Sequence, residues 1–221
     1  MANYKAGEKT REKILTVARE LVYRNGSGNT TSAQISQKAD VNLGTIIYHF
    51  KSLDGLFGCI YDDILNQRSE LIMSVLRKKF PECNNATLAL AQYRINTQSY
   101  IDYPNYAHFV AEQLFKSSVW NTEAMYISLE QIAEDFGLKL SENEIYLHKF
   151  LFLPFASLAT SSINDGYLNS TVKEICEYQS RIRLESLRIP KEKIDETLKK
   201  VDEIASQVRI SVDELMFVHC D

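Results

Sequence analysis

Apolar residues in the first third of the chain recur at the spacing of amphipathic α-helices, with about 3.6 residues per turn. One stripe predicts a helix from about residue 9 to residue 25, which Gly26 ends. Two short helices follow, and a long helix that Ser52 can cap is expected over about residues 53–79. The inward-facing residues of the four stripes are Ile14, Ala18, Leu21 and Val22, then Ile35 and Ala39, then Ile46 and Phe50, and finally Leu56, Phe57, Ile60, Ile64, Leu65 and Leu71.

Capping residues mark the starts of the two short helices. The stretch Thr31-Ser32-Ala33-Gln34 is a capping box, in which a hydroxyl and an amide three residues later satisfy each other's backbone donors. Asp40-Val41-Asn42 then breaks the pattern, and Asn42 is a good N-cap because its side-chain oxygen accepts from unpaired amides. Two short helices joined by a three-residue turn are typical of a helix-turn-helix that reads DNA.

The outer face of the second short helix carries groups suited to DNA. With Ile46 and Phe50 directed inward, Tyr48 lies opposite them. Thr and Tyr hydroxyls and the His ring supply donors for phosphates and base edges, and a glycine lets the backbone approach closely. The residues expected to contact DNA are Thr31, Ser32, Asn42, Leu43, Gly44, Thr45, Ile47, Tyr48, His49 and Lys51. The plainer alternative is a pair of ordinary packing helices with a few surface aromatics.

The string GTIIYHFKS, from Gly44 to Ser52, closely resembles the recognition-helix signature of the tetracycline-repressor (TetR/AcrR) family of bacterial transcription regulators, which reads roughly GTLYYHFKS. The resemblance covers about residues 9–57. Three residues depart from the family pattern: Ile47 replaces a frequent Tyr, Asp40 a small turn residue, and Leu53 a frequent Lys. These departures affect the expected DNA contacts rather than the fold.

The resemblance implies an all-α fold with two domains. A three-helix helix-turn-helix domain is expected over residues 1–53, followed by a helical regulatory and dimerisation domain over residues 54–221. The charge distribution agrees, because residues 1–53 hold eight Lys and Arg against four Asp and Glu, whereas the rest of the chain is acidic. The basic N-terminal segment, which holds Lys5, Lys9, Arg11 and Lys13, is interpreted as a flexible arm that touches DNA.

The remaining sequence predicts further helices. Three of medium length are expected over residues 86–101, about 106–117 and about 121–136. A capping box at Ser141 opens a helix to about residue 164 that Pro154 should kink. Its apolar side chains from residue 146 to residue 158 fall almost all round, which predicts burial on every face, one side against a partner chain.

A third capping box opens the next helix at Thr171, and the resemblance implies that these two late helices form the dimer interface. Another amphipathic helix follows Pro190, and Ser211 to Glu214 is interpreted as the cap of a short terminal helix. The tail from residue 190 has three open roles: it covers a pocket, extends the dimer interface, or simply packs.

Aromatic residues are frequent in the middle of the chain. They are explained either by a core of large side chains or by an apolar ligand cavity with a few polar groups. The candidate ligand-binding residues are Asn96, Tyr100, His108, Gln113, Trp120, Tyr126 and Phe152. On the second interpretation the effector is a small apolar or aromatic molecule.

Composition limits the other functions. Hydrophobic residues make up 45% of the 221 residues, with 8 Gly and 4 Pro, which is typical of a mainly helical globular protein. The four cysteines form no CxxC motif, and His219-Cys220 is a weak metal site, so we expect no metal and no cofactor. The start of the chain has no apolar signal segment, and the run from Phe150 to Ala156 is too short to span a bilayer, so a cytoplasmic protein without membrane contact is expected.

The sequence as a whole predicts a homodimeric transcription regulator that binds a palindromic operator on double-stranded DNA and is released by a small-molecule effector. Family resemblance favours a repressor over an activator. One alternative is a DNA-binding protein of this fold that is controlled by a protein partner. A helical enzyme is the remote alternative, because no His or Cys residues share a motif with catalytic spacing.

Overall fold

The computed structural model describes residues 2–116, 127–152 and 155–220. The three N-terminal helices are α1 (Ala2–Asn25), α2 (Ser32–Ala39) and α3 (Leu43–Phe50), with a 3-10 turn, η1 (Ser27–Asn29), after α1. Their predicted stripes meet in a core that includes Ile14, Ile35 and Ile46, each at most 1% exposed. We call these helices the head.

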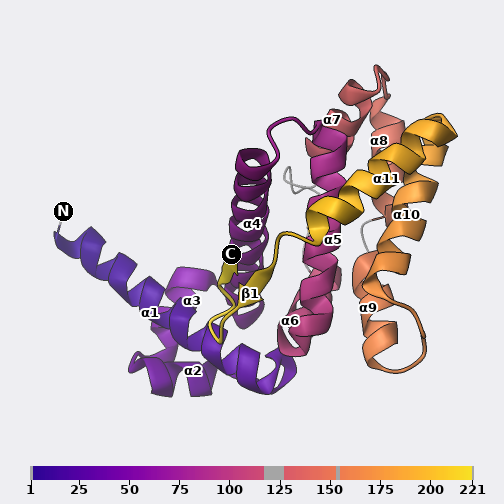
Figure 1. Cartoon of the computed structure of the whole chain (residues 1–221). Helices are drawn as coiled ribbons and strands as arrows, with labels where there is room; N and C mark the ends of the chain where they lie inside the picture. The colour runs from indigo at the N-terminus through magenta and orange to yellow at the C-terminus, as the bar shows by residue number, and fades with distance from the viewer. Residues whose placement is uncertain (1, 117–126, 153–154, 221) are drawn as a thin grey trace.

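The predicted caps of the head are confirmed. Thr31 and Gln34 form the reciprocal capping box at the start of α2, and Asn42 caps α3. The start of α1, in contrast, differs from the prediction. The helix begins at Ala2 rather than near Lys9, so the basic N-terminal segment is helical and not a flexible arm. Ala, Lys, Glu and Arg all favour helix, and Gly7 alone does not interrupt it. The first turns of α1 project from the head (Figure 1).

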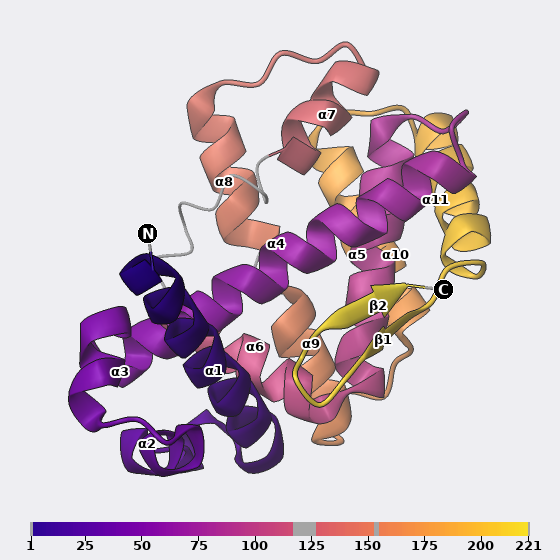
Figure 2. The ribbon, with the colours of Figure 1, turned by 90° about the vertical axis from the view of Figure 1, so that its left-hand side faces the viewer.

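A single long helix, α4 (Leu53–Lys79), leaves the head and runs into the rest of the molecule (Figure 2). Ser52 caps it, as predicted, and its buried face includes Leu56, Ile60 and Ile64. Ile72, rather than the predicted Leu71, is the fully buried residue near its end. The predicted domain boundary after residue 53 falls in the first turn of this helix.

The regulatory half of the molecule is built around α5 (Asn85–Asp102), which contacts α4, α6, α7, α9, α10 and α11. Among the described residues it is accompanied by α6 (Pro104–Lys116), α7 (Ile127–Asp135), α8 (Glu142–Phe152), α9 (Phe155–Asn164), α10 (Val172–Ser186) and α11 (Lys191–Ala205). The capping boxes predicted at Ser141 and Thr171 are present. In the described part of the chain, none of the helices combines the length and the apolar character needed to cross a membrane.

Two expectations for this half are corrected. The helix predicted from Ser141 to residue 164 is two helices, α8 and α9, on either side of residues 153–154, which lie outside the described residues. Apolar side chains on these helices are not buried on every face, since Tyr146, Leu147 and Leu158 are 49–60% exposed. The described part of the chain therefore leaves these apolar side chains largely uncovered.

The C-terminus forms a β-hairpin and not the predicted terminal helix. Strands β1 (Ile210–Val212) and β2 (Val218–Cys220) pair antiparallel, and β2 packs on α4. The β-branched residues Ile210 and Val212 are both buried while Ser211 between them is less so, which is the alternation of a strand. Asp213 closes the turn, because its carboxylate accepts from the backbone N–H groups of Leu215 and Phe217. The stretch from Ser211 to Glu214, predicted to cap a helix, instead holds the end of β1 and the start of this turn.

Candidate DNA-binding surface and regulatory core

The reading helix α3 is fixed at both ends. The Oδ1 atom of Asn42 accepts from the backbone N–H of Thr45 at 2.8 Å and from the Thr45 hydroxyl at 3.0 Å. At the other end Lys51 lies at φ 68°, and its N–H donates to the carbonyl of Ile47. The burial of Ile46 and Phe50 sets the rotation of the helix. The opposite face is therefore held out toward solvent.

That face carries large side chains that nothing in the head covers. Tyr48 is 75% exposed, Ile47 58% and Leu43 48%. The ring of His49 meets Tyr48 edge-on at 5.1 Å between centroids and braces it. A tyrosine hydroxyl can reach phosphate oxygens, while an exposed isoleucine suits the methyl group of thymine. The predicted contact residues Gly44, Ile47, Tyr48 and Lys51 are all exposed.

The start of α2 lies in the same head. Thr31 is exposed, its N–H donates to Oε1 of Gln34 at 2.8 Å, and its hydroxyl accepts from the Gln34 N–H. Ser32 follows as the first residue of the helix. A helix N-terminus favours anions through its unpaired N–H groups and its dipole, so this end suits a DNA phosphate.

Gly55 is a residue of this surface that the sequence analysis missed. A Cβ atom at this position would lie 2.2 Å from the carbonyl oxygen of Phe50. The end of α3 and the start of α4 therefore touch through backbone atoms alone, and only glycine fits. At Gly44 a Cβ would lie 3.2 Å from Oδ1 of Asn42, close to the cap that starts α3.

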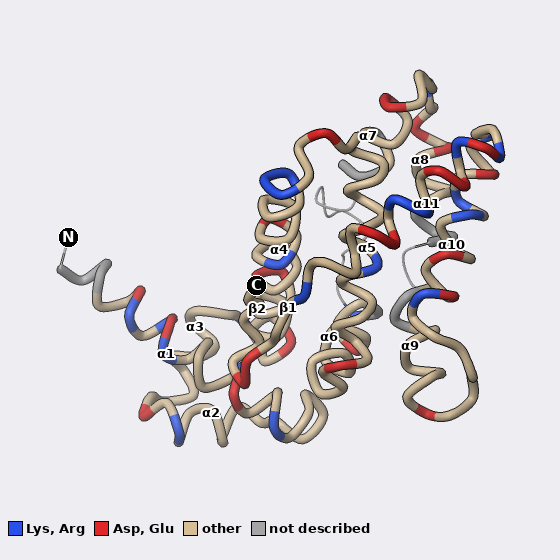
Figure 3. Tube along the Cα trace, viewed as in Figure 1, with Lys and Arg blue, Asp and Glu red and all other residues tan. Residues whose placement is uncertain are grey.

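Several basic side chains of the head are engaged in contacts within the protein. Figure 3 shows Lys and Arg along α1 and α2, and both signs interspersed on α10 and α11. Lys38 pairs with Glu20 at 2.7 Å, and Arg24 pairs with Glu214 at 2.6 Å. Arg11 lies over the ring of Phe50, 5.2 Å from its centroid, so it braces α3 from α1.

The regulatory core brings together some of the predicted ligand-binding residues. Tyr100 is buried and its hydroxyl accepts from Arg68 at 2.9 Å. The buried Oδ1 of Asn96 and Nε2 of Gln113 have no hydrogen-bond partner among the described residues. His108, however, is 71% exposed and pairs with Glu112 at 3.1 Å, away from these buried groups.

Three other predicted ligand residues cannot be placed in this core. Trp120 and Tyr126 lie outside the described residues, as does the side chain of Phe152 in α8.

Arg68 is the centre of the core, and the sequence analysis missed it. It lies on α4 in phase with the buried Phe57, Tyr61 and Ile64, a placement that could have revealed it as a charged residue in an apolar stripe. Its Nη1 donates to the hydroxyls of Tyr100 and Tyr106, both at 2.9 Å. Burial acts to lower the pKa of Arg68, but the two tyrosines more than offset this, so the group stays charged.

Ser27 and Arg19 contact the regulatory half from the head. The hydroxyl of Ser27 in η1 donates to the carboxylate of Glu112 in α6. Arg19 in α1, only 2% exposed, donates to Asp63 in α4 at 2.7 Å and to the carbonyl of Leu215 in the hairpin at 3.2 Å.

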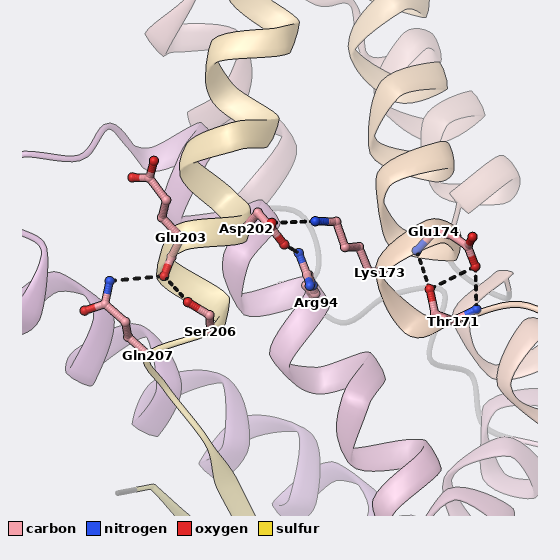
Figure 4. A network of polar contacts seen from close by, with 8 residues as sticks. All are labelled: Arg94, Thr171, Lys173, Glu174, Asp202, Glu203, Ser206 and Gln207. Carbon is pink, nitrogen blue, oxygen red and sulfur yellow. Dashed lines mark hydrogen bonds and ion pairs between the residues drawn. The ribbon is translucent and has the colours of Figure 1, made fainter.

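A hollow of about 270 Å³ opens on the surface between α5, α10 and α11, away from the predicted ligand residues. Most of its charged side chains are paired with one another. Asp202 accepts from both Arg94 and Lys173, as Figure 4 shows, and Arg181 pairs with Asp195. This hollow is explained by surface ion pairs that tie the three helices together.

Metal-binding groups do not gather in the part of the chain that the structure describes, where no three His, Cys, Asp or Glu side chains could hold an ion together. His219 at the predicted weak metal site instead meets the Asp213 carboxylate at 3.0 Å. The four cysteines form no disulfide.

Comparison with known proteins agrees with this geometry. Residues 14–59 match the family described as bacterial regulatory proteins, tetR family. The HTH-type transcriptional regulator QacR of Staphylococcus aureus is 40% identical over 47 residues, which are 21% of this chain and only 25% of QacR.

Solved structures extend the likeness to the fold of the whole chain. A structure of RolR with resorcinol has a TM-score of 0.62 at 15% identity, over 88% of this chain and 95% of that one. FadR of Thermus thermophilus, a repressor of the TetR family bound to lauroyl-CoA, has a TM-score of 0.56 at 15% identity, over 82% of this chain and 96% of that one. Residues 14–59 of this chain, in the head and the first turns of α4, therefore match the family of bacterial regulatory proteins, tetR family, and the chain as a whole shares the helical fold of these solved structures.

Proposed function

We propose that this chain is a homodimeric repressor that binds a palindromic operator in bacterial cytoplasm and is released from it by a small-molecule effector. The observation that carries the proposal is the outward face of α3, where Tyr48, Ile47 and Leu43 are exposed on a helix fixed at both ends. Large side chains held rigidly in solvent favour binding to a partner surface. On a short helix of a helix-turn-helix, that surface is the major groove.

Exposed apolar residues on the late helices support the dimer. Tyr146 and Leu147 in α8 and Leu158 in α9 are joined by Tyr178 and Ile182 in α10, all at least 39% exposed. Large apolar side chains gathered on neighbouring helices mark protein interfaces. Two heads related by a twofold axis would meet successive major grooves, which requires a symmetric operator.

The packing of α6 supports release by an effector. This helix contributes Tyr106 to the buried core around Arg68 and Glu112 to the contact with Ser27 in the head. An effector in the core that shifts α6 would therefore shift the head as well. The effector would then weaken the binding of DNA, and DNA would weaken the binding of the effector by the same factor. Effectors named for similar structures, resorcinol and lauroyl-CoA, agree with the apolar or aromatic effector expected here.

The proposal is tested by selecting bound DNA from a random duplex library with the purified full chain at physiological salt. A twofold-symmetric consensus is the expected result. The Tyr48→Ala variant should lose specific binding and keep its oligomeric state in sedimentation, because α3, which carries Tyr48, lies well apart from α8, α9 and α10 (Figure 1). A consensus that is equally well bound by this variant would contradict the assignment of α3 as the reading helix.

A further inference from the structure

The guanidinium of Arg68 is buried, and none of its hydrogen-bond partners among the described residues is a carboxylate. The residue is 7% exposed, and among the described side chains its partners are the neutral hydroxyls of Tyr100 and Tyr106. Arg19 in α1, which is also buried, pairs in contrast with the carboxylate of Asp63. A buried charge that lacks an ionic partner is costly, typically by several kcal/mol after relaxation.

The tyrosines around Arg68 supply dipoles and not charge. Burial raises the pKa of Tyr106 to about 12, and it also raises the pKa of Tyr61, which lies two turns before Arg68 on the same face of α4. Both phenols are therefore protonated at neutral pH. The positive charge of the cluster is partly solvated by hydroxyl oxygens but is not neutralised.

One edge of the guanidinium is unused. Both tyrosines accept from Nη1, whereas Nε is buried and has no hydrogen-bond partner. An unpaired buried donor destabilises the fold, so an arginine with only a structural role is expected to have its Nε paired. A carboxylate fits such an edge, because its two oxygens match the parallel N–H groups of an arginine fork.

The surroundings of Arg68 add a second unsatisfied group and an aromatic wall. Asn96 lies one turn from Gln92 and one turn from Tyr100 on α5, and both of those residues bond to α4, so Asn96 faces α4 too. Its buried Oδ1 has no partner. The rings of Tyr100 and Tyr106 stack with centroids 6.1 Å apart and an angle of 29° between their planes.

We propose that Arg68 anchors an effector that carries a carboxylate, with the apolar body of the effector against the Tyr100–Tyr106 wall. The carboxylate accepts from the Nε edge, and Asn96 accepts from a hydroxyl or amide donor on the same molecule. The inference rests on the proposed release by a small molecule and assigns its chemical class. Since Tyr106 belongs to α6, the site is adjacent to the helix that contacts Ser27 in the head.

The rival explanation is structural: Arg68 only ties α4 to α5 and α6. The two explanations differ in what a carboxylate does to the folded protein. A ligand that binds the native state raises its unfolding temperature, whereas a purely structural arginine gives no preference between a carboxylate and its neutral amide.

The test measures thermal unfolding of the full chain with benzoate, salicylate and octanoate, each compared with its amide at the same pH and ionic strength. We expect at least one carboxylate to stabilise the wild type more than its amide. Arg68→Met should remove this preference and lower the affinity for the carboxylate by about tenfold or more, because charge-assisted hydrogen bonds are lost. Arg77→Met, an exposed position on the same helix, is the matched control and should keep the preference.

Arg68→Lys is a second variant for the case in which the methionine variant unfolds, because lysine retains the positive charge. Lysine lacks the parallel N–H groups of the guanidinium, so this variant should bind the carboxylate less tightly than the wild type. Equal stabilisation by every carboxylate and its amide, or a preference that survives in Arg68→Met, would overturn the inference. Retention of the selected operator DNA is measured in the same samples. Release of the DNA from the wild type by a neutral amide as readily as by its carboxylate would leave the proposed function standing and the carboxylate site refuted.

Discussion

The side chain of Arg19 in α1 donates to the carboxylate of Asp63 in α4 at 2.7 Å, and the same guanidinium lies under the ring of Phe217, 4.6 Å from its centroid. Its other nitrogen donates to the carbonyl of Leu215. One buried residue thus joins the head, the long helix and the C-terminal hairpin. Burial lowers the pKa of Arg19 from its usual 12.5, and Asp63 opposes this shift.

Replacing Arg19 by Met should destabilise the protein by about 1–3 kcal/mol, since it removes a buried charge-assisted hydrogen bond and the contact with Phe217. Arg24→Met is the control, because Arg24 pairs with Glu214 in solvent and such exposed pairs contribute little to stability. Urea unfolding measures both, and hydrogen exchange should show the amides of the hairpin opening only in the Arg19 variant. Equal losses in the two variants would mean that Arg19 does not hold the hairpin.

Gly55→Ala should disrupt the junction of α3 and α4. The added Cβ would lie 2.2 Å from the Phe50 carbonyl oxygen, so the helices must move apart, at a cost typical of overpacking, about 1–3 kcal/mol. Gly58→Ala in the same helix meets nothing within 4 Å and should instead stabilise α4 by about 0.5–1 kcal/mol. Urea unfolding and operator affinity are measured together. A Gly55 variant as stable as the Gly58 variant would show that the junction yields easily.

These junctions also show where sequence-based prediction succeeds and where it ends. The caps at Thr31, Asn42, Ser52 and Thr171 were predicted because a cap depends on residues within four positions of it. The orientation of α3 followed from its own periodicity, so the exposure of Tyr48 was predictable as well. The candidate DNA-binding surface was therefore predictable, because its geometry depends on residues that are close together in the sequence.

The regulatory core, in contrast, is formed by residues that are far apart in the sequence. The role of Arg68 depends on its partners Tyr100 and Tyr106, which lie 32 and 38 positions away in the sequence and are brought to it by the packing of α5 and α6. The hairpin was missed because Ser211 to Glu214 fits a helix cap and a strand end alike, and its packing on α4 decides between them. His108 was proposed for its chemistry, while its direction is set by how α6 packs.

Asp40 should oppose DNA binding. It occupies the turn before α3 in the left-handed conformation, at φ 50°, and is exposed. Asp40→Asn retains a residue that tolerates this conformation and removes the charge, so operator affinity should rise a few-fold at low salt and converge with the wild type at high salt. Asp40→Gly should raise affinity equally and also gain up to about 1 kcal/mol of stability from relief of the backbone. Unchanged affinity in both variants would place the turn away from the phosphates.

Lys51 should contact a phosphate. It is exposed at the end of α3, so Lys51→Ala is expected to reduce the slope of log K against log salt by about 0.9 for each protomer. Lys51→Arg should keep the slope, and Lys191→Ala, at the start of α11, serves as a distant control. The backbone stays at positive φ in all Lys51 variants, so its strain does not bias the comparison. A slope that does not move would mean that Lys51 faces solvent in the complex.

The turn of the hairpin should weaken in acid through Asp213. Burial acts to raise the pKa of this carboxyl, but donors from His219 and from the backbone N–H groups of Phe217 and Leu215 outweigh it and hold the pKa below the usual 3.8. A carboxyl with a lowered folded pKa stabilises the protein above its unfolded pKa, and this contribution is lost as pH falls through the folded pKa. The loss should therefore begin near pH 5 and continue below 3.8.

Asp213→Asn tests this dependence, because its amide oxygen can still accept from the two backbone N–H groups but does not titrate in this range. The variant should be less stable than the wild type at pH 6, and the difference in unfolding free energy should shrink toward pH 3. His219→Gln removes one donor and keeps the other two, so it should retain part of the acid dependence. Urea unfolding at a series of pH values measures all three proteins. Parallel curves for the wild type and Asp213→Asn would show that this carboxylate does not hold the turn.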